Sequence, residues 1–562
     1  MKKKIIIILA LIVLLGGGLR FWRLASHPVS LSIDEVAIGY NSYSILKTAR
    51  DEHGQFLPLA FRSIGDFKPP ILIYLSMPAI LLFGLNEFGV RLTIALIGTL
   101  TIISVYLLTK ELTKNETISL LTSFSLAISP WHIQFSRATF EAILALFFMI
   151  TGIWLFLKTV RQSCRFLWLS AIFLSLAMYS YHSERLVVPL LVLGMTIIFW
   201  QELWQHKKET LLAFFTALLI CIPFIHLMLG PEGQTRAVHA FINRDYEINR
   251  ELNQPLDFLG HVFASNPVIL FNFWLKRYSD YWNLRFMFFD GIKLTLPGTP
   301  DVGLFHLFEI IPFLIGSWFI LFKKKVLKGK KKKIFFCWLL LGPLAASLAN
   351  NPQHPLRSLT IIPMFQIIVG IGGFWLLSWF GKKGVFKKAL VSLSALVIIT
   401  VSLIYYGDIY YVHFPIHFSE CWSYGLKDVA QYAWAHKDEY DEIVIDPTFG
   451  TRGPDTVSVP YLYVLFYGQY DPYSFQNSPR RGALTGDLLD FENFTFREIY
   501  WPQDRSQKGN LFIGSPWRLP PEDLSQEQIL KKITFKNGAT SFLIVETTKS
   551  AKSGKKMLEK TY

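Results

Sequence analysis

Carboxylates and cations stand at the ends of long apolar runs in this chain. Asp34 and Glu35 follow the first run, Lys68 precedes a later one, and Arg137 and Glu141 precede another. A carboxylate can accept a proton, and a cation can stabilise a group that gains negative charge. Acid and cation opening to one membrane face therefore indicate a site, provided that the intervening elements bring them together.

Each of these residues also has an ordinary structural explanation. Ser32 or Asp34 can cap the helix that the next residues predict. Lys68 can snorkel to a membrane interface. Arg137 and Glu141 are four residues apart, which suits an ion pair within one helix if the helix extends that far. The sequence leaves these alternatives open.

The composition indicates a membrane protein. Of the 562 residues 52% are hydrophobic, with 48 Phe and 16 Trp, which is more apolar surface than a soluble fold can hide. Much of the net charge of +15 lies in short lysine-rich loops, where anionic lipid explains it, so we expect no nucleic-acid partner. Four cysteines without a CxxC or Cys/His cluster argue against a disulfide framework, a thiol mechanism or a structural zinc site.

About eleven apolar segments are long enough, or nearly so, to cross a bilayer as helices. The first follows Met1-Lys2-Lys3-Lys4 and precedes no clear cleavage site, so we expect an uncleaved signal-anchor helix. An all-α polytopic membrane protein is therefore predicted. The segments are 5–22, 88–109, 117–131, 141–158, 167–182, 185–203, 210–229, 304–322, 334–349, 357–379 and 388–406.

Lysine and arginine content alternates between the connecting segments and predicts the orientation. Lysine-rich connectors, including 323–333 and 382–388, are placed in the cytoplasm, with the N-terminus inside and the C-terminus outside. The short apolar segment 69–84 contains three prolines, and counting it as a crossing moves basic loops to the wrong side, so we expect it to be interfacial or re-entrant. The exported segments are then 23–87, 132–140, 181–184, 230–303, 350–356 and the residues after 406.

The C-terminal tail changes from aliphatic runs to mixed polar sequence and has the size of a small domain. We therefore predict a transmembrane module over 1–407 and a small extracytoplasmic α/β domain over 408–562. Its predicted strands are 442–446, 497–501, 511–514 and 541–545, and its predicted helices are 424–435 and 524–532.

Two further polar patches fall in exported segments. Tyr181 and Arg185 lie at the turn between two spans and are candidates to contact substrate, although an interfacial aromatic and basic belt explains them equally well. His354 and Arg357 begin another span and are candidates to contact phosphate or sugar. The long aromatic segment 230–303 suits a lipid-tail groove or sugar stacking, and interfacial burial explains it just as well, so we place no catalytic residue in it.

Four short motifs, taken in order, carry a family resemblance. They are Asp34-Glu35, Asp-Phe-Lys-Pro-Pro over 66–70, Asn-Glu-Phe-Gly-Val-Arg over 86–91, and Ser-Arg-x-x-x-Glu over 136–141. The chain resembles the protein O-mannosyltransferase and aminoarabinose transferase superfamily. These are integral-membrane glycosyltransferases of the GT-C class that use polyprenyl-phosphate-linked sugars. The resemblance covers about the first 410 residues in layout and is strongest over the first 150.

The resemblance implies roles for the acidic pair and the lysine. Asp34 matches the catalytic carboxylate, which would accept the proton of the acceptor as it attacks the anomeric carbon. Glu35 would orient Asp34 or pair with a nearby arginine. Lys68 matches a lysine that contacts the lipid phosphate. The implied reaction is inverting transfer to an extracytoplasmic protein, lipid or glycan acceptor.

Other residues match the superfamily less closely. Glu141 matches a second acidic position, where aminoarabinose transferases commonly have Asp. His354 and Arg357 resemble a pair common in bacterial members, and Arg137 is a further candidate for the donor phosphate. Asp34 with Glu141 offers oxygen ligands for a divalent cation, although the superfamily is generally viewed as metal-independent.

Two other classes of function fit a polytopic chain. A secondary transporter of a lipid-linked or anionic substrate is the main alternative, but transporters usually place ionisable groups near the middle of the membrane in broken helices. A sensor with an exported binding domain needs none of the early acidic motifs. The short N-terminus and the absence of retention signals favour a prokaryotic plasma membrane.

Overall fold

The computed structural model describes residues 3–63, 65–230, 250, 266–290, 302–323, 326–350, 353–381, 385–478 and 488–547. It is mostly helical, as predicted, and every one of the eleven predicted segments overlaps a helix. Among the described residues, six helices are long and apolar enough to cross a membrane, and four shorter ones are apolar. Most of the predicted exported segment 230–303 lies outside the described residues.

The chain forms two compact units, and its sequence passes between them several times. The first unit comprises 1–22, 69–72 and 94–409, and the second comprises 23–68, 73–93 and 410–562. The helix α4 (Glu87–Thr113) begins in the second unit and continues into the first. The helix α3 (Pro70–Phe83), which contains Pro78, covers the segment predicted to be interfacial or re-entrant.

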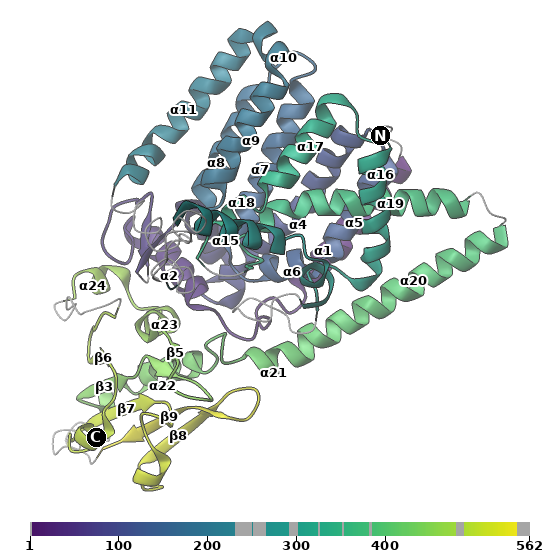
Figure 1. Ribbon diagram of the computed structural model, residues 1–562. Coiled ribbons are helices and arrows are strands. Elements are labelled where there is room, and N and C mark those ends of the chain that lie inside the picture. The colour runs from purple at the N-terminus through teal and green to yellow at the C-terminus, as the bar shows by residue number, and fades with distance from the viewer. Residues whose placement is uncertain are drawn as a thin grey trace, which may run out of the picture. The chain divides into compact units, whose positions relative to one another are not determined.

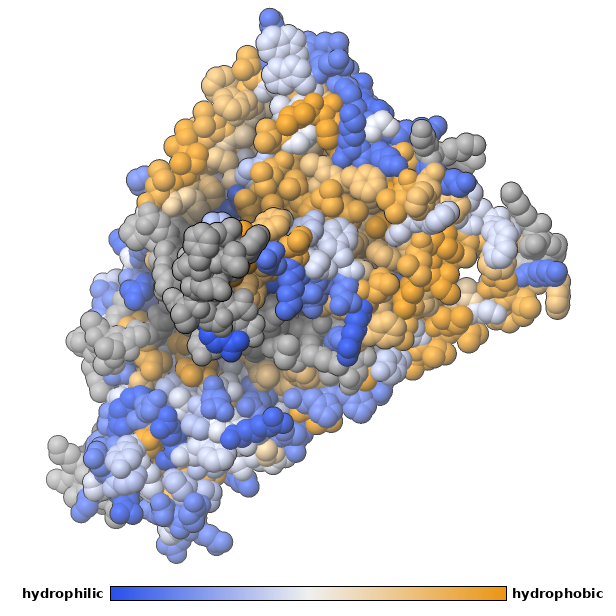
Figure 2. Space-filling view, viewed as in Figure 1, coloured by the Kyte–Doolittle hydropathy of each residue, from blue (hydrophilic) through white to orange (hydrophobic). Residues whose placement is uncertain are grey.

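The first unit is a bundle of helices around two buried members. Four-fifths of α7 and of α19 is buried, whereas α1, α11 and α20 expose apolar side chains along most of their length. Figure 2 shows apolar surface over α11 and α20. Lipid is the solvent that accommodates such surface. The bounds are α1 Lys3–Phe21, α5 Glu116–Ile128, α6 Pro130–Arg137, α7 Glu141–Thr159, α8 Leu167–Ser180, α9 Glu184–Ile198, α10 Trp200–Gln205, α11 Lys207–Leu229, α15 Asn266–Asp280, α16 Ile310–Phe322, α17 Gly329–Leu341, α18 Leu344–Ser347, α19 Ile362–Gly381 and α20 Val385–Asp408.

The second unit joins the first polar loop of the chain to its tail (Figure 1). From the loop come the helix α2 (Ile33–Thr48) and a hairpin of β1 (Phe61–Ser63) and β2 (Asp66–Lys68). The tail supplies a five-stranded sheet in the order β6-β3-β7-β9-β8, in which β3 runs parallel to β6 and β7 while β9 is antiparallel to β7 and β8. The tail elements are α21 Phe414–Phe418, α22 Leu426–Ala435, β3 Glu442–Ile445, β4 Thr448–Phe449, β5 Thr456–Val457, α23 Pro460–Tyr467, α24 Pro472–Gln476, β6 Phe494–Phe496, α25 Trp501–Asp504, β7 Asn510–Gly514, β8 Ile529–Thr534 and β9 Thr540–Glu546.

Two predicted elements of the tail are wrong. The helix predicted at 524–532 is replaced by β8, because the edge of β9 offers pairing partners for residues whose helix propensity is only a weak preference. The strand predicted at 497–501 lies three residues earlier as β6, and α25 begins with Trp501-Pro502 where the strand was predicted to end.

One apolar core holds the second unit together. It contains residues of α2, such as Val36 and Tyr40, beside residues of α22, α23 and the sheet, such as Leu462 and Ile443. Because these side chains are fully buried, α2 is part of the core of the tail domain rather than a separate loop helix.

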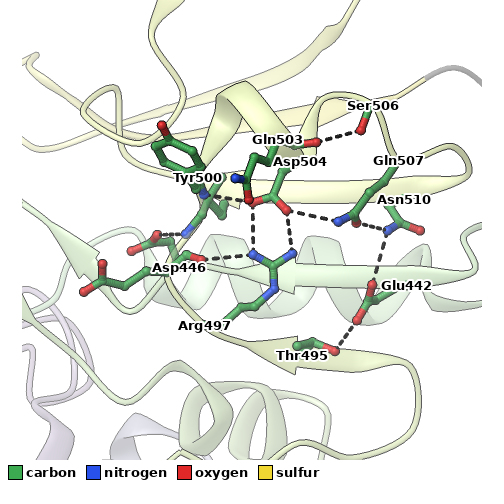
Figure 3. Close-up of polar contacts among 12 residues, drawn as sticks. Glu442, Asp446, Thr495, Arg497, Tyr500, Gln503, Asp504, Ser506, Gln507 and Asn510 are labelled. Carbon is green, nitrogen blue, oxygen red and sulfur yellow. Dashed lines mark hydrogen bonds and ion pairs between the residues drawn. The ribbon is translucent and has the colours of Figure 1, made fainter.

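A polar network ties the strands of this sheet (Figure 3). Glu442 on β3 accepts hydrogen bonds from Thr495 (2.6 Å) on β6 and from Asn510 (3.2 Å) on β7. Arg497 donates two hydrogen bonds to Asp504, at 3.0 and 2.8 Å. The groups bond one another, so we interpret the network as structural.

Candidate active site

The start of α2 determines what its two carboxylates can do. The Ser32 hydroxyl caps the helix by accepting a hydrogen bond from the Glu35 backbone N–H (3.3 Å), and Glu35 Oε2 accepts one from the Ser32 N–H (2.9 Å). This reciprocal pair is a capping box. Ser32 and Glu35 therefore perform the capping role that the sequence also allowed for Asp34. The Asp34 side chain is about half exposed, at 48%.

The hairpin of β1 and β2 places Lys68 beside Asp34. β1 and β2 pair with Phe61 opposite Lys68, and Gly65 lies in the tight turn at a φ of 66°, which favours glycine. Lys68 ends β2 and is largely buried, at 13% exposure. Its Nζ donates a hydrogen bond to the Asp34 carboxylate and forms an ion pair with it. The first two motifs thus meet in space.

A buried ion pair between Glu35 and Arg91 stabilises the start of α2. Arg91 on α4 contacts Glu35 through two hydrogen bonds, Nε to Oε1 at 2.7 Å and Nη2 to Oε2 at 3.2 Å, and both side chains are fully buried. Of the two roles expected for Glu35, the structure contains the pairing with an arginine. Arg91 also donates to the carbonyls of Leu24 (3.1 Å), Pro28 (2.9 Å) and Ser30 (2.5 Å). One guanidinium therefore organises both α2 and the loop before it.

Residues of the tail support the same helix. The Tyr463 hydroxyl on α23 donates to the Leu31 carbonyl at 3.0 Å. Burial, with a smaller contribution from the nearby carboxylates of Glu35 and Asp34, raises the pKa of Tyr463, so the phenol stays a hydrogen-bond donor at neutral pH. Gly39 allows α2 to approach α23 closely, because a Cβ there would lie 2.7 Å from the ring of Phe466.

In the first unit, Arg137 and Glu141 lie on different helices. α6 ends at Arg137, Ala138 is extended, and α7 begins at Glu141, so the spacing of an ion pair within one helix does not apply. The Arg137 guanidinium donates to the carbonyls of Leu19 (2.8 Å), Arg20 (2.9 Å) and Trp22 (2.8 Å) at the end of α1. Cationic donors at a helix C-terminus satisfy carbonyls that have no partner within the helix.

The other two predicted patches meet in the first unit. The Ser183 hydroxyl, at the turn that carries Tyr181 and Arg185, donates to the Arg357 carbonyl at 3.3 Å. Tyr181 is buried, and the Arg185 guanidinium lies 5.1 Å from the centre of the Phe224 ring. The His354 backbone N–H bonds the Tyr281 hydroxyl at 3.0 Å.

The structure thus groups the predicted site residues into two sets. Asp34, Glu35 and Lys68 lie together in the second unit, whereas the remaining candidates lie in the first: Arg137, Glu141, Tyr181, Arg185, His354 and Arg357. Arg91 and Tyr463 were not among the predicted site residues. An arginine beside an apolar span signals Arg91, but nothing local signals Tyr463. Within the described part of the chain, no group of three or more His, Cys, Asp or Glu side chains is placed to hold a metal ion.

Comparison with known families agrees with the motifs. Residues 67–226 match the family model described as dolichyl-phosphate-mannose-protein mannosyltransferase. These residues carry a domain of this mannosyltransferase family. The resemblance to GT-C glycosyltransferases is confirmed, and the chain is a multi-pass membrane protein. The match includes Lys68, Arg91 and Glu141 but begins after Asp34.

Relatives and solved structures extend the likeness. An uncharacterized protein of Aquifex aeolicus (strain VF5) is 23% identical over 66% of this chain and 77% of its own length. YkcB of Bacillus subtilis (strain 168) is 26% identical over 31% of this chain, which spans only 23% of that protein. ArnT from Cupriavidus metallidurans has a similar fold, with a TM-score of 0.51, 11% identity and coverage of 96% and 97% of the two chains. An Archaeoglobus fulgidus oligosaccharyltransferase also scores 0.51, at 14% identity, with 83% of this chain and 63% of that one covered.

Proposed function

We propose that this protein is an integral-membrane glycosyltransferase that moves a sugar from a polyprenyl-phosphate donor to an extracytoplasmic acceptor with inversion. The observation that carries the proposal is the ion pair of Asp34 and Lys68 in a chain with a mannosyltransferase-family domain. The family description names a polyprenyl-phosphate-linked sugar as its donor class.

In this mechanism Asp34 is the base. Its carboxylate accepts the proton of the acceptor hydroxyl or amine while the acceptor atom bonds to the anomeric carbon. The bond from that carbon to the phosphate oxygen breaks in the same displacement, and the polyprenyl phosphate leaves with its electron pair. A single displacement inverts the anomeric centre. Ser32 and Glu35 already cap the helix, so the half-exposed Asp34 carboxylate is not needed as a cap. This supports its role as the base.

In the same mechanism Lys68 binds and stabilises the phosphate of the leaving group. Its ammonium pairs with Asp34 in the absence of donor, and the donor phosphate competes for the same cation. Donor binding would therefore draw Lys68 toward phosphate and release the carboxylate to act as base. Glu35 and Arg91 hold the helix start in place during this exchange.

The first-unit candidates complete the proposal. We propose Glu141 as a second acidic site residue, Arg137, His354 and Arg357 as contacts to the donor phosphate, and Tyr181 and Arg185 as substrate contacts. We also propose that the protein lies in the plasma membrane with its active site and tail outside. The transporter alternative is not proposed, because Asp34 and Lys68 lie at a helix start and a hairpin rather than in a broken helix.

Transfer of label tests the base. Membranes that contain the full chain would be given a radiolabelled polyprenyl-phosphate sugar, and label in the endogenous acceptor fraction would be counted. Asp34→Asn should retain folding and donor binding but lose about 10²- to 10⁴-fold in transfer. Asp523→Asn, an exposed aspartate of the tail, is the matched control and should transfer normally. Wild-type transfer by a folded Asp34→Asn protein would refute the role.

A further inference from the structure

The second unit contains a cavity that the proposed mechanism does not use. It has a volume of about 560 Å³, within the size range of small-ligand sites. Its walls come from the loop after α1, the start of α4, the residues around α21, the start of α22 and the turn between β8 and β9. The side chains that matter for the argument are Arg23, His27, Tyr411, Tyr424, Lys427 and Lys536.

Two of its cations have no protein partner for their charge. Within the described residues, the side chains of Arg23 and Lys536 form no hydrogen bond and no ion pair, although the Lys536 Nζ lies 4.9 Å from the centre of the Tyr424 ring. Lys427, by contrast, donates to Glu87 at 2.6 Å. Both side chains are solvent-exposed, so their charges are available to a negatively charged ligand.

The remaining walls suit a ligand rich in hydroxyl groups. Tyr411 and Tyr424 present aromatic rings, and Glu87 and Asp428 present carboxylates that accept hydrogen bonds. His27 Nε2 bonds the Tyr411 carbonyl at 3.3 Å, which fixes one side of the wall. Carboxylates beside unpaired cations disfavour a bare anion and favour a ring that carries both hydroxyls and an anionic group.

The cavity wall is linked by hydrogen bonds to the start of the helix that carries the proposed base. Ser30 lines it, and the Ser30 carbonyl accepts a hydrogen bond from Arg91, which pairs with Glu35 next to Asp34. Glu87 lines it as well and begins the helix that carries Arg91. Ser30, in the cavity wall, precedes the proposed base by four residues in the sequence.

The cavity also lies where the chain leaves two candidate membrane spans. Arg23 follows α1 by two residues, and Tyr411 belongs to the last turns of the candidate span 389–418. Both spans end on the same side in the predicted topology. A lipid headgroup and a soluble glycan are therefore the two sources of the ligand to be tested.

We infer that this cavity holds the acceptor and that the acceptor is an anionic saccharide, a hydroxyl-bearing ring with a phosphate or similar charged group. The identification of the bound saccharide as the acceptor rests on the proposed function, whereas the ligand class follows from the cavity itself. Arg23 and Lys536 bind the charge, and the aromatic and acidic side chains bind the ring.

Binding to the full chain tests the ligand class without any need for transfer. The purified protein would be titrated calorimetrically with mannose 6-phosphate, and separately with mannose and with inorganic phosphate. For the lipid source, binding of protein in phosphatidylcholine nanodiscs would be compared with and without phosphatidylinositol, whose headgroup joins a polyhydroxylated ring to phosphate. Preference for one arm identifies the source, and either preference supports the site.

Matched variants locate the binding. Arg23→Ala and Lys536→Ala should each weaken phosphosugar binding by roughly 10- to 100-fold, because each removes a charge-assisted hydrogen bond. Lys532→Ala, an exposed lysine on β8, should change nothing. The titration needs no sugar transfer, so a failure of the proposed base and a failure of this cavity give different results.

Three outcomes would overturn the inference. The first is unchanged affinity in Lys536→Ala and Arg23→Ala. The second is equal affinity for inorganic phosphate and mannose 6-phosphate, since the ring would then contribute nothing. The third is no saturable binding of any anionic saccharide probe. Loss of transfer in Asp34→Asn would still support the proposed function in each case.

Discussion

Arg91→Met should be among the most damaging single substitutions in the second unit. Methionine fills most of the space but leaves the Glu35 carboxylate buried without its cation. It also removes the three hydrogen bonds to the carbonyls of Leu24, Pro28 and Ser30. Both side chains of the ion pair are fully buried, so solvent cannot replace the lost contacts.

The size of the effect follows from these contacts. Removal of one partner of a buried ion pair costs about 3–5 kcal/mol, and each abandoned carbonyl adds roughly 1 kcal/mol or more unless the loop rearranges. The ion pair alone, at about 5 kcal/mol, lowers the melting temperature of a unit of this size by roughly 10–20 °C, and the carbonyls add to this shift. Because whole domains are stable by only about 5–15 kcal/mol, partial unfolding of the variant is expected.

Thermal unfolding in detergent, followed by tryptophan fluorescence and by limited proteolysis, measures the shift. Arg62→Met, an exposed arginine on β1, is the control and should move stability by about 0.5 kcal/mol at most. Glu35→Gln should cost less than Arg91→Met because the amide retains hydrogen bonds. The double variant should be more stable than the sum of the two single losses predicts, by about 0.5–3 kcal/mol. Additive losses, or a shift in Arg91→Met no larger than in Arg62→Met, would refute the reasoning.

Three further predictions concern the site and its placement. Gly39→Ala should destabilise the second unit by about 1–3 kcal/mol in the same melting assay because its Cβ has no room, whereas Gly18→Ala, whose Cβ meets open space, should not. Lys68→Ala should weaken binding of a defined polyprenyl-phosphate sugar and slow transfer, and Lys68→Arg should recover part of each. Unchanged affinity and turnover in Lys68→Ala would show that this residue only snorkels to the membrane interface. In a cysteine-free background, a cysteine at exposed Ser506 should react with an impermeant reagent in intact cells and one at exposed Lys328 should not, and the reverse pattern would invert the proposed topology.

The apolar spans could be predicted from sequence because a bilayer imposes a length and a composition on each helix. The meeting of Asp34 and Lys68 could also be anticipated, since both stand at span ends that were assigned to one face. Pairing with an arginine was one of the two roles expected for Glu35, and Arg91 is the last residue of the motif over 86–91.

The remaining features depend on contacts between distant residues. No local pattern shows that Tyr463 bonds the Leu31 carbonyl, because that contact joins positions more than 400 residues apart. Arg137, at the end of α6, donates hydrogen bonds to carbonyls of α1 that lie more than 100 residues earlier in the chain. The residues of β8 have acceptable helix propensity, and only the neighbouring strand β9 decides their conformation.

The mixed core of the second unit sets an order of events during synthesis. More than 300 residues separate Thr93 from Tyr410, so α2 leaves the ribosome well before its packing partners exist. At roughly 5–20 residues per second, the delay is on the order of 15–60 s. During this interval the apolar face of α2, with Val36 and Tyr40, has no partner from the tail and is exposed to association with chaperones or with other chains. A chain that stops within α20 would carry every residue proposed for catalysis and still lack the core that gives Asp34 its position.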